Sequence, residues 1–213
     1  MTPADAPILA AFDLDGTLTT SDTFLPFLAR VGGRSSVAVA LAASGTTWLG
    51  EGRDAAKAAS VRRALSGHDL SRLEQLGVVH AEQIVGCVRQ RPWRPGLRKG
   101  TVERLQEHVR LGHRVVVVSA SLRVYVAPIA AALGITEVIA TDLAVDDRGR
   151  ATGELLGANC RGAEKVARLE RLIEPDWTSA WAYGDSSGDR EMIERAANGV
   201  WVRKGRLEGP VPR

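Results

Sequence analysis

The chain has 213 residues, of which 45% are hydrophobic and 25% are charged, and its formal net charge is +3. These values are typical of a globular protein that can bury a substantial core, as one enlarged domain or as a core with an insertion. Basic residues are scattered without interleaved aromatics and no apolar run approaches the ~18 residues that span a bilayer, so we expect neither nucleic-acid binding nor stable membrane insertion.

The first predicted element is a buried strand over the apolar residues 8–12. Two carboxylates, Asp13 and Asp15, follow it directly, and then Gly16 and Thr17 mark a turn. One interpretation is a solvated acidic turn. The other is a carboxylate pair that faces a pocket at the carboxyl edge of a sheet, where open α/β sheets bind ligands.

A long helical stretch interrupts the chain after this strand. Residues 22–90 contain no convincing strand, and their apolar side chains recur at helical spacing around 24–31, 58–65 and 73–84. The Pro/Gly-rich segment 91–96 then indicates a return to the core. We therefore expect a helical cap at 22–90, inserted into an α/β core made of 1–21 and 91–213.

Strands and helices alternate in the remainder of the chain. The run of four valines at 115–118 predicts a strand buried on both faces of a parallel sheet. Further strands are expected at 137–140, 180–183 and 200–202, with a hairpin at 144–155, helices ending near 112, 133, 173 and 197, and an irregular tail at 204–213. The predicted fold class is α/β, a doubly wound parallel sheet with a Rossmann-like core and a helical cap after the first strand.

Three further positions carry polar groups suited to binding phosphate or a metal ion. Ser119 follows the valine strand and either caps the next helix or forms an anion site with its first N–H groups. Lys165 lies in the first turn of a helix, where the dipole disfavours it, so it either binds an anion or is a solvated surface lysine. Asp185 and Asp189 flank a strand-to-helix turn and could cap the helix or bind Mg²⁺ with oxygen ligands.

The order of these four sites resembles the phosphatases of the haloacid dehalogenase superfamily, subfamily IB, which includes phosphoserine phosphatase. The resemblance covers nearly the whole core and rests on Asp13-Leu14-Asp15-Gly16-Thr17, Ser119, Lys165 and Gly184-Asp185…Asp189. It implies Mg²⁺-dependent hydrolysis of a phosphate monoester of a small metabolite. It also implies a helical cap that closes over the site and selects the leaving group.

The resemblance assigns a role to each residue. Asp13 would be the nucleophile that forms an aspartyl-phosphate, and Asp15 would be the general acid and base. Mg²⁺ would bind the carboxylates of Asp13 and Asp185 and the main-chain carbonyl of Asp15, with Asp189 supporting this metal site.

The phosphoryl oxygens would be bound by the polar groups of Ser119, Lys165 and Thr17. Asp22 occupies the place of the acidic residue that holds the substrate amine in phosphoserine phosphatases, where we would expect Glu. Gly16 also replaces a frequent serine. Phosphoserine, histidinol phosphate and lysophospholipid head groups therefore remain candidate substrates, and Arg53, Arg62 and Arg63 remain candidate ligands of a substrate carboxylate.

Two alternatives to hydrolysis stay open at this stage. The first is a phosphotransferase that uses the same aspartyl-phosphate, and the second is a non-catalytic protein that binds a phospholigand on the same scaffold. Residues 1–7 lack the pattern of a secretory signal, and Cys87 and Cys160 show no disulfide or metal-site spacing. We therefore expect a soluble cytoplasmic protein with free thiols.

Overall fold

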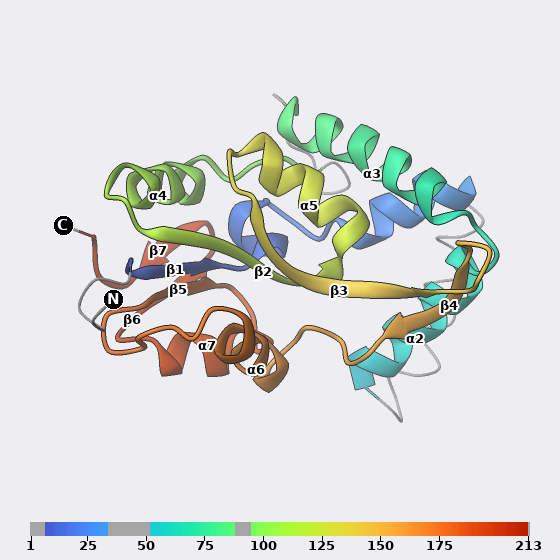
Figure 1. Cartoon of the computed structure of the whole chain (residues 1–213). Helices are drawn as coiled ribbons and strands as arrows, with labels where there is room; N and C mark the ends of the chain where they lie inside the picture. Colours follow the sequence, from blue (N-terminus) through green and yellow to red (C-terminus); the bar gives the residue numbers. More distant parts are fainter. Residues whose placement is uncertain (1–6, 34–51, 88–94, 213) are drawn as a thin grey trace.

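A computed structural model describes residues 7–33, 52–87 and 95–212 and shows a seven-stranded sheet between two layers of helices (Figure 1). The strand order is β4-β3-β2-β1-β5-β6-β7. The strands are β1 (Leu9–Phe12), β2 (Arg114–Leu122), β3 (Glu137–Val145), β4 (Ala151–Leu156), β5 (Trp181–Gly184), β6 (Asn198–Arg203) and β7 (Arg206–Glu208). The five inner strands are parallel, whereas β4 and β7 are antiparallel additions at the two edges, so the sheet is mixed.

The helices are distributed over both faces of this sheet. Those in the described part of the chain are 24–33, α2 (Gly52–Leu65), α3 (Leu70–Val85), α4 (Lys99–Arg110), α5 (Arg123–Ala132), α6 (Ala163–Leu172) and α7 (Arg190–Arg195). In Figure 1, α3, α4 and α5 lie above the sheet and α6 and α7 lie below it. None of the helices that the structure describes is long and apolar enough to cross a membrane.

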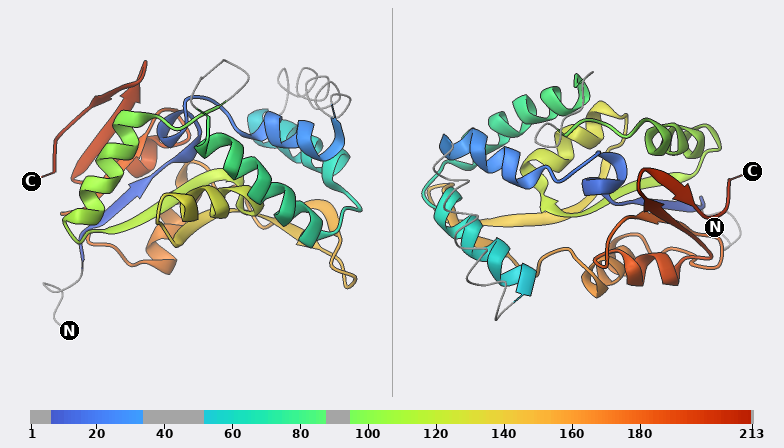
Figure 2. Two further views of the ribbon diagram at one scale, coloured as in Figure 1. Left: turned by 90° about the horizontal axis from the view of Figure 1, so that it is seen from above. Right: turned by 180° about the vertical axis from the view of Figure 1, so that it is seen from behind.

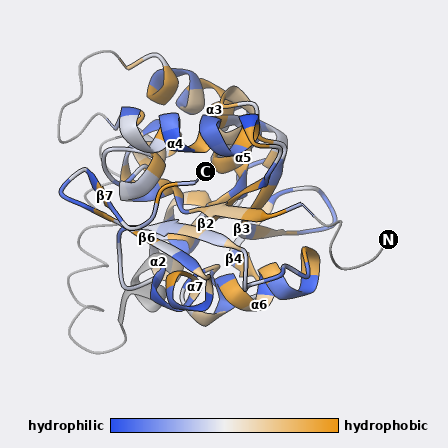
Figure 3. Ribbon diagram, turned by 90° about the vertical axis from the view of Figure 1, so that its left-hand side faces the viewer, coloured by the Kyte–Doolittle hydropathy of each residue, from blue (hydrophilic) through white to orange (hydrophobic). Residues whose placement is uncertain are grey.

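The central strands are apolar on both sides because helices cover both faces of the sheet. Along β1, Ala10 and Phe12 belong to one hydrophobic cluster, whereas Leu9 and Ala11 belong to the other. The valines of β2 alternate in the same way. Figure 3 shows apolar residues concentrated in β2 and β3 at the centre of the molecule. This arrangement confirms the predicted α/β fold with a doubly covered sheet.

Two predicted boundaries were wrong. The tail at 204–213 is not wholly irregular, because β7 pairs with β6 through a turn in which Lys204 and Gly205 both have positive φ. Turns of this kind join the strands of tight hairpins. The strand that begins near the four valines also continues to Leu122, although its pairing with β3 changes register between Val118 and Leu122.

The helices of the predicted cap share the larger hydrophobic cluster with the core. Phe27 from helix 24–33, Leu65 from α2 and Leu73 from α3 are buried in the same cluster as Leu105 from α4. Both views in Figure 2 place helix 24–33 beside α3. The 22–90 insertion therefore has no separate core among its described residues, and its division from 1–21 and 91–213 remains a prediction.

Helix α3 approaches α5 so closely that a side chain is excluded at one position. A Cβ atom on Gly77 of α3 would lie 1.9 Å from the carbonyl oxygen of Val124 and 3.2 Å from the Cα atom of Tyr125. Both of these are backbone atoms, so the clash cannot be relieved by a change of rotamer. Gly77 therefore sets the distance between α3 and the α/β core.

We expect Gly77→Ala to lower the free energy of unfolding by about 3 kcal/mol, because the two helices must separate to accept the methyl group. Gly100→Ala in α4 is the matched control, since a Cβ atom there meets nothing within 4 Å. Better helix propensity should leave that variant unchanged or more stable by up to about 1 kcal/mol. Urea denaturation of both variants measures the difference, and equal stabilities would contradict the close helix contact.

Candidate active site

The segment Asp13-Leu14-Asp15-Gly16-Thr17 lies where β1 ends and the chain turns. The Asp13 N–H donates to the Tyr183 carbonyl at 2.9 Å, so Asp13 still lies alongside β5. The turn Leu14–Leu18 follows, and Gly16 adopts a φ of 81° within it. A Cβ atom on Gly16 would lie 2.2 Å from Oδ2 of Asp185. Glycine at this position therefore allows the Asp185 carboxylate to lie against the turn that follows Asp13.

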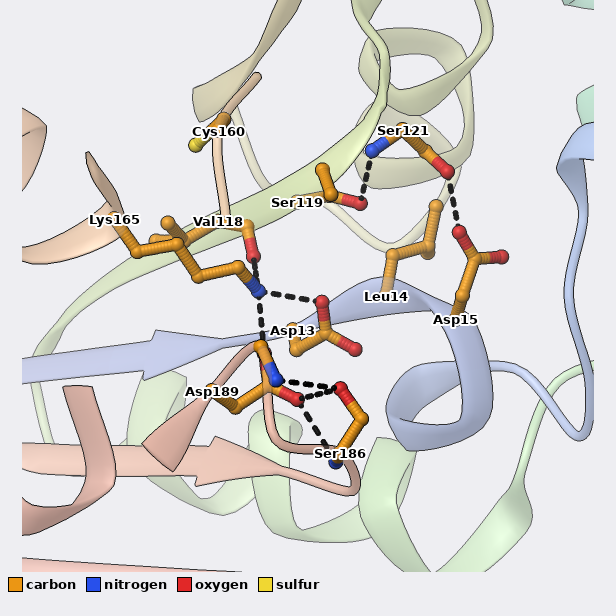
Figure 4. A network of polar contacts seen from close by, with 12 residues as sticks. Asp13, Leu14, Asp15, Val118, Ser119, Ser121, Cys160, Lys165, Ser186 and Asp189 are labelled. Carbon is orange, nitrogen blue, oxygen red and sulfur yellow. Dashed lines mark hydrogen bonds and ion pairs between the residues drawn. The ribbon is translucent and has the colours of Figure 1, made fainter. Parts of the chain in front are cut away.

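Lys165 joins Asp13 to Asp189 in the interior (Figure 4). Its side chain is only 1% exposed, and its Nζ atom donates to Asp13 Oδ1 at 2.6 Å and Asp189 Oδ1 at 2.6 Å. A third bond goes to the Val118 carbonyl at 2.8 Å. Lys165 is therefore not a solvated surface lysine, and its two carboxylate partners explain a cation in the first turn of α6.

The Gly184–Asp189 loop follows β5 and folds back on itself. Oδ2 of Asp189 accepts hydrogen bonds from the Ser186 N–H at 3.0 Å and the Ser186 hydroxyl at 2.9 Å. Asp189 makes no side-chain capping bond to α7, so the alternative of a simple helix cap does not describe it. A Cβ atom on Gly184 would lie 2.3 Å from the Asp189 Cβ atom, which explains the glycine before Asp185.

Burial and mutual repulsion control the ionisation of these carboxylates. Burial and the adjacent Asp189 raise the pKa of Asp13 well above its ordinary value, although the Lys165 ammonium opposes this shift. The same two causes, burial and Asp189, raise the pKa of Asp185 to about 6. Burial also disfavours the charged form of Asp189, but Lys165 and Ser186 outweigh it and lower the pKa. Lys165 therefore compensates only part of the negative charge gathered here.

This group of carboxylates fits a bound Mg²⁺ ion. Oxygen atoms of Asp13, Asp185 and Asp189 all lie within 4.8 Å of one another, and oxygen ligands are those that Mg²⁺ prefers. Both oxygens of Asp189 already accept hydrogen bonds. Asp13 and Asp185 are therefore better placed to bind the ion directly, with Asp189 holding Lys165 and the loop. The predicted contribution of the Asp15 main-chain carbonyl stays a prediction.

The side chain of Asp15 is held by three donors. Its Oδ1 atom accepts from the Thr23 N–H at 2.7 Å and the Thr23 hydroxyl at 2.6 Å, and its Oδ2 atom accepts from the Ser121 hydroxyl. Burial and the nearby Asp22 carboxylate raise the pKa of Asp15 to about 6, against the effect of these bonds. A carboxyl group with such a pKa can donate and accept protons near neutral pH.

Ser119 lines a cavity that Asp13 and Asp15 also line, and it does not cap a helix. Its buried hydroxyl accepts from the Ser121 N–H at 3.0 Å, and α5 begins only at Arg123. The expectation that Ser119 precedes the first turn of the next helix was therefore wrong, because β2 extends through Leu122. The structure instead places Ser119 in the wall of the cavity that Asp13 and Asp15 also line.

Thr17 differs from its predicted role, whereas the predicted role of Asp22 in substrate selection stays a prediction. Thr17 is fully buried, is not among the residues that line the cavity, and its hydroxyl has no hydrogen-bond partner in the described part of the chain, so it is not positioned to bind phosphate. Asp22 lines the cavity, but its Oδ1 atom accepts from the N–H groups of Phe24 at 2.9 Å and Leu25 at 3.2 Å. The Oδ1 atom of Asp22 therefore caps helix 24–33, while the residue itself lies in the cavity wall.

The cavity above these groups has a volume of about 590 Å³. Phe24, Leu25 and Ser60 line it from the helical insertion. The core contributes a set of polar and basic residues that sequence reasoning did not identify, namely Arg98, Asn159, Arg161 and Lys204. Of these residues, only Asn159 lies in a segment that the family resemblance covers, the stretch that leads into Lys165.

Arg98 and the other arginines differ in how they relate to this cavity. The Arg98 guanidinium donates to the Gly16 carbonyl at 3.0 Å and so braces the turn that follows Asp15. The side chain of Arg53 lies outside the described residues. Arg62 forms an ion pair with Glu154 at 2.7 Å, and neither it nor Arg63 lines the cavity.

Comparison with known proteins places this geometry in a family. Residues 10–194 match the model of haloacid dehalogenase-like hydrolases. Protein CicA of Caulobacter vibrioides is 38% identical over 190 residues, which are 88% of this chain and 82% of that protein. A Bordetella pertussis protein of unknown function has a similar structure, with a TM-score of 0.71 and 25% identity over 89% of this chain and 86% of that one.

A phosphoserine phosphatase, solved as an analogue of its phospho-aspartyl intermediate, shares the fold with a TM-score of 0.61. It is 22% identical to this chain, and the match covers 91% of this chain and 85% of that one. The α/β fold is the one that this phosphoserine phosphatase has, and the family match makes the chain a hydrolase. The chain belongs to the haloacid dehalogenase-like hydrolase family.

Proposed function

We propose that this phosphatase hydrolyses the phosphate monoester of a small metabolite through an aspartyl-phosphate on Asp13, with Mg²⁺ as its cofactor. The observation that carries the proposal is the position of Asp13 at the base of the cavity. Its carboxylate lies within 2.6 Å of the Lys165 ammonium and close to the oxygens of Asp185 and Asp189. Mg²⁺ bound by Asp13 and Asp185 would reduce the repulsion between the nucleophile and a phosphate dianion.

Asp13 and Asp15 divide the chemistry between them in this proposal. An oxygen of Asp13 forms the bond to phosphorus while the bond from phosphorus to the leaving oxygen breaks, and Asp15 gives its proton to that oxygen. Asp15 then accepts a proton from the water that attacks the phosphorus atom. This second step releases phosphate and regenerates the Asp13 carboxylate.

Ser119 and Lys165 support these steps in different ways. The Ser119 hydroxyl is available at the cavity wall to donate to a phosphoryl oxygen. All three N–H donors of Lys165 are directed at protein acceptors. Lys165 therefore supplies positive charge and fixes the position of Asp13. It would contact a phosphoryl oxygen only if one of its N–H groups were shared between that oxygen and a protein acceptor.

The cavity favours a leaving group that carries a second anionic group. Arg98, Arg161 and Lys204 line it from the core, whereas Asp22 is engaged as a helix cap. Of the candidate substrates, phosphoserine offers a carboxylate that these cations could bind, whereas histidinol phosphate does not. Phosphoethanolamine has the amine of phosphoserine without its carboxylate, and it therefore isolates the contribution of the cations.

The test is phosphate release by purified protein from phosphoserine, phosphoethanolamine, histidinol phosphate and p-nitrophenyl phosphate, with Mg²⁺ or with EDTA. We expect Mg²⁺-dependent release, with kcat/KM for phosphoserine about tenfold or more above that for phosphoethanolamine. An added alcohol acceptor separates hydrolysis from phosphotransfer, because a transferase would form the acceptor's phosphate ester. Lack of release from all four compounds with Mg²⁺ present would overturn the proposal.

A further inference from the structure

The contacts of Thr23 are not those of a residue that merely starts a helix. A residue at a helix start usually bonds to N–H groups of its own first turn, but Asp22 already does so here. The Thr23 hydroxyl and N–H instead both reach back eight residues to Oδ1 of Asp15, at 2.6 and 2.7 Å. Both donor groups of this fully buried residue are therefore used on one carboxylate oxygen.

Ser121 holds the other oxygen of the same carboxylate. Its hydroxyl donates to Oδ2 of Asp15, while its N–H donates to Ser119 Oγ at 3.0 Å, as Figure 4 shows. Ser121 lies where the pairing between β2 and β3 changes register, and its side chain is only 5% exposed. The two Asp15 oxygens are thus fixed from opposite parts of the chain, one by the helical insertion and one by the core.

A buried histidine fixes Thr23 in turn. His80 of α3 is 2% exposed, and its Nε2 atom lies 3.1 Å from the Thr23 carbonyl oxygen, which can only accept, so Nε2 carries the hydrogen. The same carbonyl accepts from the Phe27 N–H at 3.1 Å. The His80 ring also packs against Phe27 and Tyr125. Because Gly77 brings α3 against α5, the position of His80 is tied to the core.

The geometry points to Thr23 and Ser121 as positioning residues that orient the Asp15 carboxyl group for proton transfer to the leaving group, with His80 fixing Thr23. This inference rests on the proposed function, in which Asp15 is the general acid. Loss of either hydroxyl leaves Asp15 present but removes one of the three donors that orient its carboxyl group toward the leaving oxygen. Such a defect affects only reactions in which the leaving oxygen needs a proton.

Two substrates of similar size separate this defect from general damage. p-Nitrophenyl phosphate releases a stable phenolate that needs little protonation, whereas benzyl phosphate releases a strongly basic alkoxide. The quantity to compare is kcat/KM, because it reports the steps up to formation of the aspartyl-phosphate. We expect Thr23→Val and Ser121→Ala to lower kcat/KM for benzyl phosphate by about 100-fold and that for p-nitrophenyl phosphate by less than about fivefold.

Two further variants serve as controls. Thr23→Ser keeps the hydroxyl and should restore the benzyl phosphate rate to within about threefold of the unmodified enzyme. Thr101→Val, in a buried threonine of α4 outside the cavity, should change neither rate. Thermal unfolding identifies any variant that fails to fold, and because Thr23 and Ser121 lie on different elements, one folded variant is enough for the test.

Asp15→Asn distinguishes failure of this inference from failure of the proposed function. If Asp15→Asn separates the two substrates but Thr23→Val and Ser121→Ala lower both rates equally or not at all, the positioning role is wrong and the acid assignment stands. If Asp15→Asn itself affects both substrates equally, Asp15 is not the general acid, and both the assignment and the positioning role are wrong.

Discussion

Replacement of Asp13 by asparagine is expected to abolish phosphoenzyme formation and to lower kcat by about four orders of magnitude or more. The amide cannot attack phosphorus, yet it has almost the shape of the carboxylate. Burial already disfavours the charged form of Asp13, and Lys165 keeps Asp189 as a partner, so the variant should fold. Acid quenching followed by mass spectrometry detects the added phosphoryl group directly.

Asp15→Asn should behave differently in the same experiment. It should still form the phosphoenzyme from p-nitrophenyl phosphate, but the intermediate should accumulate because no carboxylate accepts the proton of the attacking water. Mg²⁺ affinity should fall in Asp13→Asn and be largely kept in Asp15→Asn, whose main-chain carbonyl is unchanged. Asp147→Asn, in the exposed turn between β3 and β4, is the charge-matched control and should keep full activity. A phosphoenzyme in Asp13→Asn, or equal losses of Mg²⁺ affinity, would contradict the assignment.

Lys165→Met is expected to have the largest effect on stability, lowering the free energy of unfolding by about 3–5 kcal/mol at pH 7 in EDTA. The reason is that Asp13 and Asp189, which are 6% and 2% exposed, lose the cation that both of them contact. Lys99→Met, an exposed lysine with a surface partner, is the control and should change stability by less than about 1 kcal/mol.

The Lys165→Met deficit should shrink as the pH falls from 7 to 5. Burial and Asp189 raise the folded-state pKa of Asp13 even beside Lys165, and loss of the ammonium removes the effect that most lowers the pKa values of both carboxyl groups. The folded state then binds more protons than the unfolded state, so lowering the pH through this window stabilises the folded state. A urea titration at each pH measures the effect. A deficit that stays constant or grows would mean that Lys165 does not compensate these carboxylates.

The sequence predicted the fold and the site best at positions where few structural environments can explain the residues present. Four successive valines specify a strand in a buried parallel sheet, and a pair of aspartates after a strand is costly unless it binds something. Lys165 in the first turn of a helix was anomalous for the same reason, and the two carboxylates on its Nζ atom account for it. Each of these features would raise the free energy of its own segment unless a partner or a particular environment compensated for it. This can be judged without knowing the fold.

The contacts of Thr23 and Ser121 could not be predicted in this way. Hydroxyl residues are common at strand ends and helix starts, and only the folded chain shows that both bond to Asp15. The same applies to Arg98, which reaches the Gly16 carbonyl across 82 positions of sequence. The β6–β7 hairpin was missed because Lys204 and Gly205 form its turn without the more familiar Asn-Gly pair.

The packing of the helical insertion has a consequence for how such enzymes diversify. Gly77 meets the backbone of α5, and a Cβ atom on Gly153 of β4 would lie 2.9 Å from the Cα atom of Arg62 in α2. The insertion and the core are thus fitted to each other at two glycines, one on either side of the junction. An exchange of this insertion for that of a relative would have to carry α5 and the β3–β4 hairpin with it. Single substitutions at the cavity wall leave this fit intact, whereas recombination of whole segments would disturb it.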